Sequence, residues 1–471
     1  MQGLCGRYRG TGSAWARVGV GCLLFGLTAT VGAPGASAAG SALSTEPIPM
    51  KTEKELPART PPLIEIGPKF LGKGNLPEGI ELPTGAVWTP ALWVYGSYRT
   101  ALNTFDNGAD PQVIEWANRL DLFANLQLSG TERVLLGIQP LHDGSKFSGY
   151  RWKPDEGKQW VNGFNGEVST LFFEGDFGEI FPNLDPKDTG AYDVGFAVGR
   201  QPIFFQEGMM FNDTIDSVAI TRDTVMIPNL SVDTRITGLF GWNNINRNNN
   251  LEDDKAYVFG LFTETDFMPT TTNLDFAYVT SDSGNGGDGF YAGASATQRI
   301  GKWNTSFRAN LSVALGKETD AVSTGGLLFA EISRTLPHSD NVVYGNAFWG
   351  IDRYSSAARD ELAGGPLGRV GLLFAAVGLG NYGAPLSNRA DRVVGGAIGH
   401  QWFFNNHRTQ FVLEVGGRKG TSDDVPDAAA IGGRFQQAIG DRFVLQFDAF
   451  TSVQDNRDQG FGARTELQVR F

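Results

Sequence analysis

Apolar and polar residues alternate along most of the chain, in segments of about ten residues separated by turns rich in Gly, Asn and Asp. The final eleven residues, FGARTELQVRF at 461–471, carry apolar side chains at one parity and polar side chains at the other. The same pattern recurs at residues 119–128, 303–315 and 442–450. Successive side chains of a strand point to opposite faces, so each segment predicts a two-faced β-strand. A soluble β-sandwich and an outer-membrane barrel both fit this pattern.

Loop lengths separate these two folds, because an outer-membrane barrel has short periplasmic turns, longer external loops and an even number of strands. With the C-terminus assigned to the periplasm, short and long connections keep to their own sides along the chain. The short ones lie at 130–131, 227–229, 269–272, 301–302, 337–340, 405–406 and 439–441, and the long ones at 142–163, 202–212, 243–254, 282–288, 317–325, 419–427 and 455–460. This rhythm predicts an all-β fold, a transmembrane antiparallel up-and-down β-barrel of about 18 strands.

Two segments depart from the rhythm. Residues 174–190 form a long connection on the periplasmic side, and residues 352–390 must hold either no spanning strand or two. With none, the strands begin near residues 91, 117, 131, 164, 191, 214, 230, 256, 273, 289, 303, 326, 341, 392, 409, 429, 442 and 462.

The segment 352–390 contains GGPLGRVGLLFAAVGLGNYG at 364–383, which is too apolar for an external loop in water. We expect it to fold into the barrel mouth as a pore constriction, with flanking glycines permitting the turns. The alternative is two further strands and a barrel of twenty.

The N-terminus has the composition of a secretory leader. Three arginines precede an apolar run at 18–31, and the small residues Ala36, Ser37 and Ala38 form a cleavage site, which predicts a signal peptide at 1–38. A lipoprotein anchor at Cys22 is the competing interpretation. Residues 39–85 carry eight prolines and are interpreted as a Pro-rich periplasmic tail without helix or sheet. The barrel is assigned to 86–471.

Charge and cysteine content narrow the class further. The two cysteines, Cys5 and Cys22, lie in the predicted leader, so the exported chain would have no disulfide. Removal of the leader with its three arginines changes the formal net charge from −12 to −15, which argues against nucleic acid as a partner. The expected location is the bacterial outer membrane, with the lipid bilayer and lipopolysaccharide as partners.

The last residue, Phe471, belongs to the apolar face of the final strand. The closing strands of outer-membrane barrels look like this, and the resemblance implies that the barrel insertion machinery reads this strand.

Charged side chains on the polar faces are candidate pore-lining residues. They comprise Arg119, Asp121, Arg133, Arg235, Arg299, Arg308, Glu414, Arg434, Asp448, Arg464 and Glu466, with Asp233, Glu331 and Arg470 as further members. Arginine exceeds the acids modestly, and a positive lining inside a low-dielectric wall concentrates anions. In the alternative interpretation these charges neutralise one another and only keep the lumen wet.

The stretch VGRQPIFFQEGMMFND at 198–213 resembles the GRQ strand-loop-strand of the alginate-export family of outer-membrane porins, through Gly199, Arg200 and Gln201. The resemblance implies an eighteen-stranded pore that tolerates anionic polysaccharide and has arginines in its lumen. Arg200 shares its parity with apolar residues such as Val194 and Val198, which turns it toward lipid or the rim unless a bulge at Gly199 redirects it inward.

No enzyme is expected, because none of the four histidines stands beside a serine in a nucleophile arrangement. No cofactor or metal is expected either. Oxygen-rich segments at 243–254 and 281–289 match no EF-hand spacing and are interpreted as solvated external loops, with calcium binding as the alternative. The expected function is passive diffusion of a hydrophilic, anionic carbohydrate solute. A general or substrate-selective uptake porin, or a structural or adhesive barrel without an open pore, are the alternatives.

Overall fold

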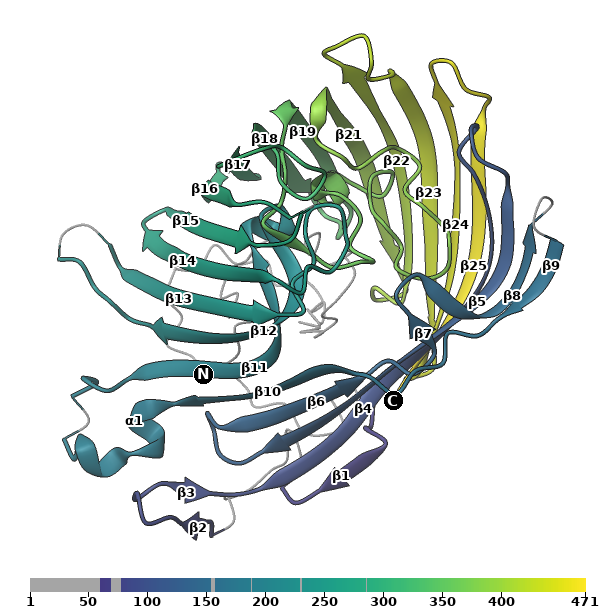
Figure 1. Cartoon of the computed structure of the whole chain (residues 1–471). Coiled ribbons are helices and arrows are strands. Elements are labelled where there is room, and N and C mark those ends of the chain that lie inside the picture. Colours follow the sequence, from purple (N-terminus) through teal and green to yellow (C-terminus); the bar gives the residue numbers. More distant parts are fainter. Residues whose placement is uncertain (1–59, 69–77, 154–156, 188, 229–230, 285) are drawn as a thin grey trace.

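The structure is a computed structural model that describes residues 60–68, 78–153, 157–187, 189–228, 231–284 and 286–471 (Figure 1). The predicted signal peptide lies outside these residues. Eighteen strands form one closed antiparallel wall, as the loop rhythm predicted. They are β4 (Ala91–Asp106), β5 (Val113–Gln127), β6 (Arg133–Ile138), β10 (Val168–Asp176), β11 (Val194–Phe205), β12 (Phe211–Arg222), β13 (Asp233–Asn243), β14 (Ala256–Phe267), β15 (Thr270–Ser281), β16 (Gly289–Ile300), β17 (Trp303–Ala314), β18 (Gly325–Thr335), β19 (Val342–Arg353), β21 (Asp391–Phe404), β22 (Thr409–Gly420), β23 (Ala428–Ile439), β24 (Phe443–Gln454) and β25 (Gly460–Arg470).

The barrel closes where its last strand meets its first. Strand β25 pairs with β4 over ten residues, from Phe461 opposite Asp106 to Arg470 opposite Ser97. Each wall strand pairs with its neighbours in the chain order, so the topology is up-and-down. Closure leaves no strand edge where β25 meets β4, which is the condition for a sheet to cross a bilayer.

The outer face of the wall is apolar. Large hydrophobic side chains that alternate with buried neighbours are solvent-exposed on nearly every strand. Examples are Leu102, Phe259, Leu261, Leu274, Phe276, Phe307, Leu311, Leu328, Trp349, Ile398, Val415, Ile431, Phe447 and Phe461. Such a band around a closed barrel is the surface that meets lipid. None of the helices in the described part of the chain is long and apolar enough to cross a membrane.

Two positions of the wall are each built from two strand pieces. Strand β6 pairs with the periplasmic half of β5, and β8 (Lys146–Lys153) continues in the same direction against the external half of β5. Strand β9 (Gly157–Val161) pairs with β8, and β10 then continues against β6. The two-residue β7 (His142–Asp143) pairs with the start of β8. Residues 142–163 were predicted as an external loop, and this was wrong, because they contain the whole of β7, β8 and β9.

Short strands also occur in the predicted tail, where proline density argued against any sheet. Strand β1 (Ile64–Ile66) pairs with β4 at Leu92–Val94, beyond the point where β25 ends, and β2 (Ile80–Glu81) pairs with β3 (Val87–Trp88). The prediction that residues 39–85 contain no sheet was therefore wrong for β1 and β2. Three residues of β1 fit between Pro62 and Pro68, because a strand this short needs few backbone donors.

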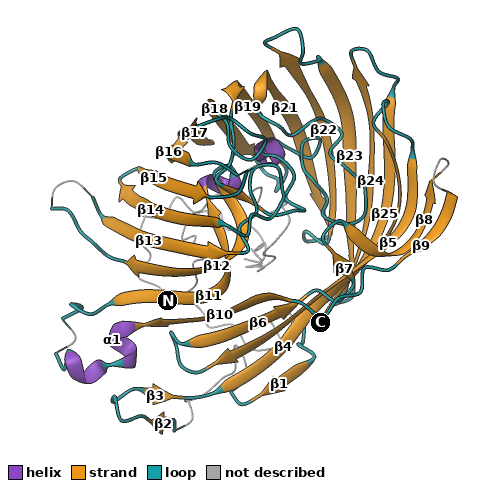
Figure 2. Cartoon of the chain, in the orientation of Figure 1, coloured by secondary structure: helices purple, strands orange, loops and turns teal. Residues whose placement is uncertain are grey.

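The long connection at 174–190 carries the only α-helix in the described residues, α1 (Phe177–Ile180), followed by the 3-10 helix η2 (Pro182–Leu184). Asp176 caps α1 by accepting hydrogen bonds from the amides of Gly178 and Glu179. The remaining 3-10 helices, η3 (Gln206–Gly208) and η4 (Pro366–Arg369), are the purple turns that lie inside the curved wall in Figure 2.

Apolar clusters fill the inside of the external part of the barrel. The larger two bring inward side chains of the wall, such as Val258, Tyr291, Leu327 and Phe348, against residues from the segments that carry η3 and η4. The barrel interior is thus partly packed and is not simply an open cylinder.

Candidate functional site

The inner face of the wall carries a row of alternating charges that we call the charged ladder: Arg434, Asp448, Arg464, Glu466 and Arg99. It crosses four adjacent strands, β23, β24, β25 and β4. The Nε of Arg434 lies 2.6 Å from Asp448 Oδ1, and Arg464 Nη2 lies 2.6 Å from Asp448 Oδ2. The Nη1 of Arg464 lies 2.5 Å from Glu466 Oε2, and Arg99 Nε lies 2.7 Å from Glu466 Oε1.

The ladder is both buried and unbalanced. Its side chains are between 1 and 17% exposed, so the charges interact in a medium of low dielectric. Three guanidinium groups face two carboxylates, which leaves one positive charge in excess. The alternation of ladder charges neutralises most of the row, and arginine retains the surplus.

Arg99 was missed by sequence analysis. It shares parity with the buried residues Ala101 and Asn103, whereas the exposed Leu102 lies on the other face. This alternation within β4 was the signal that could have identified it.

The remaining predicted candidates also lie on the inner face, but in separate pairs. Arg119 contacts Asp121 at 3.0 Å, Arg133 contacts Glu174 at 2.5 Å, and Arg235 contacts Asp223 at 2.5 Å and Glu264 at 3.5 Å. Arg299 is exposed near the short turn after β16 and donates to the carbonyl of Gly301. The structure therefore brings four candidates together in the ladder, Arg434, Asp448, Arg464 and Glu466. It places Arg119 and Asp121 beside the ladder on β5, with Arg119 directly opposite Arg99, and it distributes the others around the wall.

Residues 354–390, which we call the inserted loop, fold into the barrel without a spanning strand. This fully described segment has one short strand, β20 (Ala358–Arg359), which pairs in parallel with the start of β12. Leu367, Val370, Leu373, Phe374 and Leu379 are fully buried. The prediction of an inserted segment is confirmed, because these apolar side chains are buried against the inner wall. The twenty-strand alternative is excluded, because β19 pairs directly with β21.

Two carboxylates of the wall anchor the inserted loop. Glu414 on β22 accepts hydrogen bonds from the amides of Leu372 at 3.0 Å and Leu373 at 2.8 Å, and also from the hydroxyl of Tyr344. Glu115 on β5 accepts hydrogen bonds from the backbone amide and the side-chain amide of Asn381. The carboxylate of Glu414, which was predicted to line the pore, therefore binds the backbone of the inserted loop. Together, Glu414 and Glu115 hold the loop at two points of the wall.

A second element also points inward: the tip of the β11–β12 hairpin, residues 206–210. Gln206 donates to Asp275 of β15 at 2.7 Å, and Glu207 lies 3.3 Å from Arg308 of β17 and 3.4 Å from Arg369 of the inserted loop. Met209 and Met210 are fully buried. Residues 202–212 were predicted as an external loop, and this was wrong, because the strands extend to Phe205 and restart at Phe211 while the tip packs inside the barrel.

The GRQ motif divides between the two faces of β11. Gln201 is buried on the inner face, in line with Ala197 and Ile203, whereas Arg200 faces outward and pairs with Asp216 of β12 at 2.8 Å. Gly199 has a φ of +123°, yet the alternation continues unchanged across it. The inward-directing bulge is therefore excluded, and Arg200 does not line the lumen.

Replacing Glu414 with Gln is expected to loosen the inserted loop. A neutral amide accepts the Leu372 and Leu373 amides more weakly than a carboxylate, and charge-assisted bonds are roughly twice as strong as neutral ones. We expect faster hydrogen exchange at both amides, measured by mass spectrometry of the detergent-solubilised barrel. The control is Glu264→Gln, whose carboxylate contacts no loop residue in the described chain. Equal exchange in both variants would contradict the anchoring role.

Acidic loop residues gather where the inserted loop meets the β7–β8 turn. The carboxylate of Glu361 lies against Gly144. Burial, followed by the charges of Asp360, Asp143, Glu252 and Glu167, raises the pKa of Glu361. Burial and the neighbouring Asp254 similarly raise the pKa of Glu252.

The contact at Glu361 is therefore expected to weaken as pH rises. A carboxyl whose folded pKa exceeds its unfolded value destabilises the folded contact once it ionises, so stability is lost as pH rises from the ordinary carboxyl pKa through the raised value. Protection of the amides at 360–363 should fall as pH rises above the ordinary carboxyl pKa, after correction for intrinsic exchange. The variant Glu361→Gln should remove this pH dependence, and an unchanged pH profile would count against the contact.

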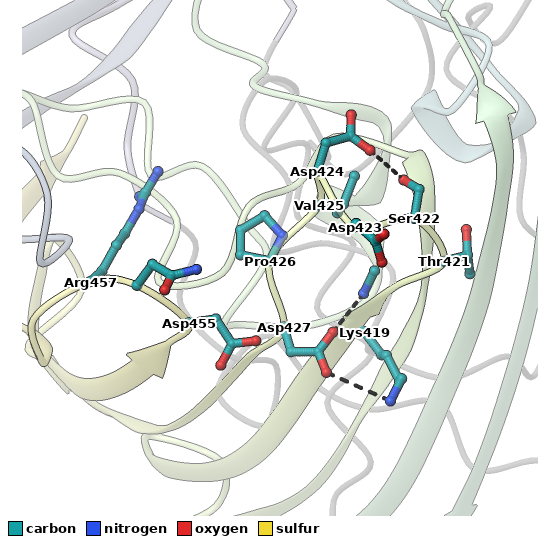
Figure 3. Close-up of a pocket in the computed structure, with 12 residues that line it drawn as sticks. Lys419, Thr421, Ser422, Asp423, Asp424, Val425, Pro426, Asp427, Asp455 and Arg457 are labelled. Atoms are coloured by element: carbon teal, nitrogen blue, oxygen red, sulfur yellow. Dashed lines mark hydrogen bonds and ion pairs between the residues drawn. The ribbon is translucent and has the colours of Figure 1, made fainter.

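The external loops form an open pocket lined by residues 419–427 and 455–457 (Figure 3). Lys419 pairs with Asp427 at 3.8 Å, and Ser422 donates to Asp424 at 2.7 Å. These side chains satisfy one another at the surface, away from the ladder. Among the residues that the structure describes, no group of three or more potential ligands is placed to hold a metal ion.

Comparison with known proteins supports the fold independently. No family model and no curated protein matches the sequence. The solved structures that resemble the chain include the outer-membrane protein OpdK of Pseudomonas aeruginosa, with a TM-score of 0.52, 10% identity, and coverage of 80% of this chain and 98% of that one. A BenF-like porin from Pseudomonas fluorescens has a TM-score of 0.54 and 10% identity, with coverage of 81% of this chain and 98% of that one. The Acinetobacter baumannii protein OccAB3 has a TM-score of 0.51 and 10% identity, with coverage of 81% of this chain and 99% of that one.

A closed eighteen-stranded barrel with an apolar outer band, and with the fold of these proteins, is an integral β-barrel of the bacterial outer membrane. At 10% identity, the similarity to these solved structures shows a shared fold.

Proposed function

We propose that the protein is a passive, substrate-selective porin for a small hydrophilic anion, with a carbohydrate acid as the first candidate. The single observation that supports this most is the charged ladder, a row of buried guanidinium and carboxylate groups with one guanidinium in excess. The GRQ resemblance to alginate exporters points to the same solute class, although Arg200 itself faces away from the lumen. Flow through such a pore follows the existing concentration gradient, in either direction.

The ladder can guide an anion because guanidinium groups have several donors in a fixed fork. Arg99 is the most exposed arginine of the ladder, at 17%, and a guanidinium has five N–H donors, so a carboxylate of the solute can bind Arg99 while it keeps its wall partner Glu466. The low-dielectric wall strengthens the attraction, and neighbouring carboxylates keep each binding step weak enough for release.

A second candidate solute is an aromatic carboxylate. The guanidinium carbon of Arg464 lies 5.7 Å from the ring centre of Tyr382, and this ring packs against Phe105 at 5.5 Å and Phe450 at 5.9 Å. A cationic group beside aromatic rings suits a flat aromatic acid. One structure of OpdK was solved with vanillate.

Swelling of proteoliposomes separates these candidates. We expect glucuronate to enter faster than glucose, which has nearly the same size and no charge. Vanillate entering faster than glucuronate would favour the aromatic candidate, and entry of alginate oligomers would favour a polysaccharide route. Equal entry of glucose and glucuronate would contradict anion selectivity, and no entry of any solute would indicate a structural or adhesive barrel.

A further inference from the structure

The connection between β10 and β11 places a short apolar segment at the periplasmic end of the barrel. It consists of α1 and η2, residues 177–184, which follow β10 directly and which we call the periplasmic foot. Figure 1 shows α1 where β10 and β11 end, beside the β2–β3 hairpin. The turn of this hairpin contacts η2, because a Cβ at Gly85 would lie 2.9 Å from the side-chain nitrogen of Asn183. The periplasmic foot therefore packs between the wall and the hairpin.

The periplasmic foot covers the lipid-facing side of the wall. On β10, Leu171 is exposed on the outward face, and Phe173 and Gly175 share its parity. A Cβ at Gly175 would lie only 3.1 Å from Cδ1 of Ile180, so the side chain of Ile180 occupies the space outside Gly175. The foot is therefore folded toward the outside of the barrel and not into its lumen.

Aromatic side chains gather on the periplasmic foot. The ring centre of Phe177 lies 4.9 Å from that of Phe181 and 6.2 Å from that of Tyr192, which precedes β11. Phe177 is 37% exposed, Tyr192 is 42% exposed, and Leu184 on η2 is 53% exposed. Aromatic rings of this kind are enriched where a bilayer meets water, and the polar tip of a tyrosine suits that boundary. The cluster thus has the composition of an interfacial anchor.

The apolar surface of the foot is continuous with the lipid-facing band of the wall. Phe196 of β11 lies directly opposite Gly175, and its ring centre is 5.7 Å from that of Phe173. Val198 follows on the same outward face and is exposed. Lipid that covers Phe196 therefore reaches Ile180 and the aromatic cluster. This continuity favours lipid over a periplasmic protein as the occupant of the foot.

The charges of the connection indicate which lipid fits. Residues 177–193 contain four acidic residues and one basic residue, Lys187. Glu179, on α1 itself, is exposed. Negative side chains repel the phosphate of an anionic headgroup and attract an ammonium group. This balance favours phosphatidylethanolamine, whose headgroup carries an ammonium, over phosphatidylglycerol.

We propose that the periplasmic foot is a phospholipid-binding element that lies in the headgroup layer of the periplasmic leaflet. The aromatic cluster contacts the acyl chains, and Glu179 pairs with the ammonium group of phosphatidylethanolamine. The foot anchors the barrel to this leaflet beside β10 and β11. This role goes beyond the proposed function and does not depend on which solute the pore conducts.

Fluorescence quenching in lipid nanodiscs tests the proposal. Both cysteines of the chain lie in the predicted leader, so Leu184→Cys gives a single site for a nitrobenzoxadiazole label on the mature protein. We expect spin-labelled lipid to quench this label about as strongly as a label at Leu274→Cys, an exposed outward position on β15. The matched control is Lys302→Cys in the exposed β16–β17 turn at the same end of the barrel, where aqueous iodide should quench several-fold more strongly than at residue 184.

A second comparison tests the headgroup. Quenching of the label at residue 184 by lipid should be stronger in discs of phosphatidylethanolamine than in discs of phosphatidylglycerol. Adding Glu179→Lys to the labelled variant should reverse this order, because the side chain then attracts the phosphate. Equal quenching in both lipids, unchanged by Glu179→Lys, would overturn the assignment of phosphatidylethanolamine.

Two outcomes would overturn lipid binding itself. Iodide quenching at residue 184 as strong as at residue 302, in discs of either lipid, would place the foot in water. A label that iodide reaches in nanodiscs and does not reach in isolated outer membranes would assign the foot to a periplasmic protein. If Leu184→Cys gives no heat-modifiable barrel, Tyr192→Cys carries the label and the same outcomes decide.

Discussion

Removal of residues 364–383 is expected to raise the single-channel conductance several-fold while the barrel remains folded. These residues carry Leu367, Val370, Leu373 and Phe374, which pack against inward side chains of β18, β19, β21 and β23 and so fill part of the bore. The wall strands on either side, β19 and β21, pair with each other directly, so the wall does not need the loop for closure. The measurement is conductance in planar bilayers, with heat-modifiable gel mobility as the check of folding.

The matched control is deletion of residues 422–425 from the external loop between β22 and β23, which lies at the surface (Figure 3). It should leave conductance unchanged. An unchanged conductance after the larger deletion would place the inserted loop away from the conducting path, and loss of the folded barrel would show that the loop supports the wall.

Replacing Asp448 with Ala is expected to destabilise the barrel by about 3–5 kcal/mol, because it leaves the buried guanidinium groups of Arg434 and Arg464 without their shared carboxylate. The temperature at which the detergent-solubilised barrel unfolds on gels should fall accordingly. Arg464 keeps its ion pair with Glu466 in this variant, whereas Arg434 loses its ion pair with Asp448.

The control for this variant is Asp320→Ala. Asp320 is 85% exposed and pairs with Arg353 at 3.2 Å, and exposed ion pairs contribute about 0–1 kcal/mol. Equal unfolding temperatures for the two variants would show that the ladder does not stabilise the folded barrel.

The wall could be predicted from sequence because each strand is specified by the alternation of its own residues and by the turn residues at its ends. In residues 303–315 every second side chain except Thr305 is apolar, and the structure has β17 at Trp303–Ala314 with Phe307 and Leu311 facing outward. The predicted strand starts lie within a few residues of the observed ones, since turn residues mark the ends of each segment. The inserted loop was also predictable, because its leucines and Phe374 needed cover that an external loop could not provide.

The inward position of the hairpin tip could not be predicted in this way. Alternation assigns a residue to one of two faces but does not show where a hairpin leaves the wall. Residues 203–211 contain Met209, Met210 and Phe211, and an apolar run within a predicted loop was the available signal. The charged ladder was predicted only in part, because pairing across β25 and β4 joins residues 99 and 466 from the two ends of the chain.

We expect the charged lumen, narrowed by the inserted loop, to conduct small anions across the outer membrane. The most direct test is the reversal potential of the purified full-length protein in a planar bilayer with a salt gradient. We expect discrete channels whose reversal potential shows a preference for chloride over potassium, and a smaller preference in the variant Arg99→Gln. Channels that prefer potassium, or a protein that inserts and never conducts, would contradict it.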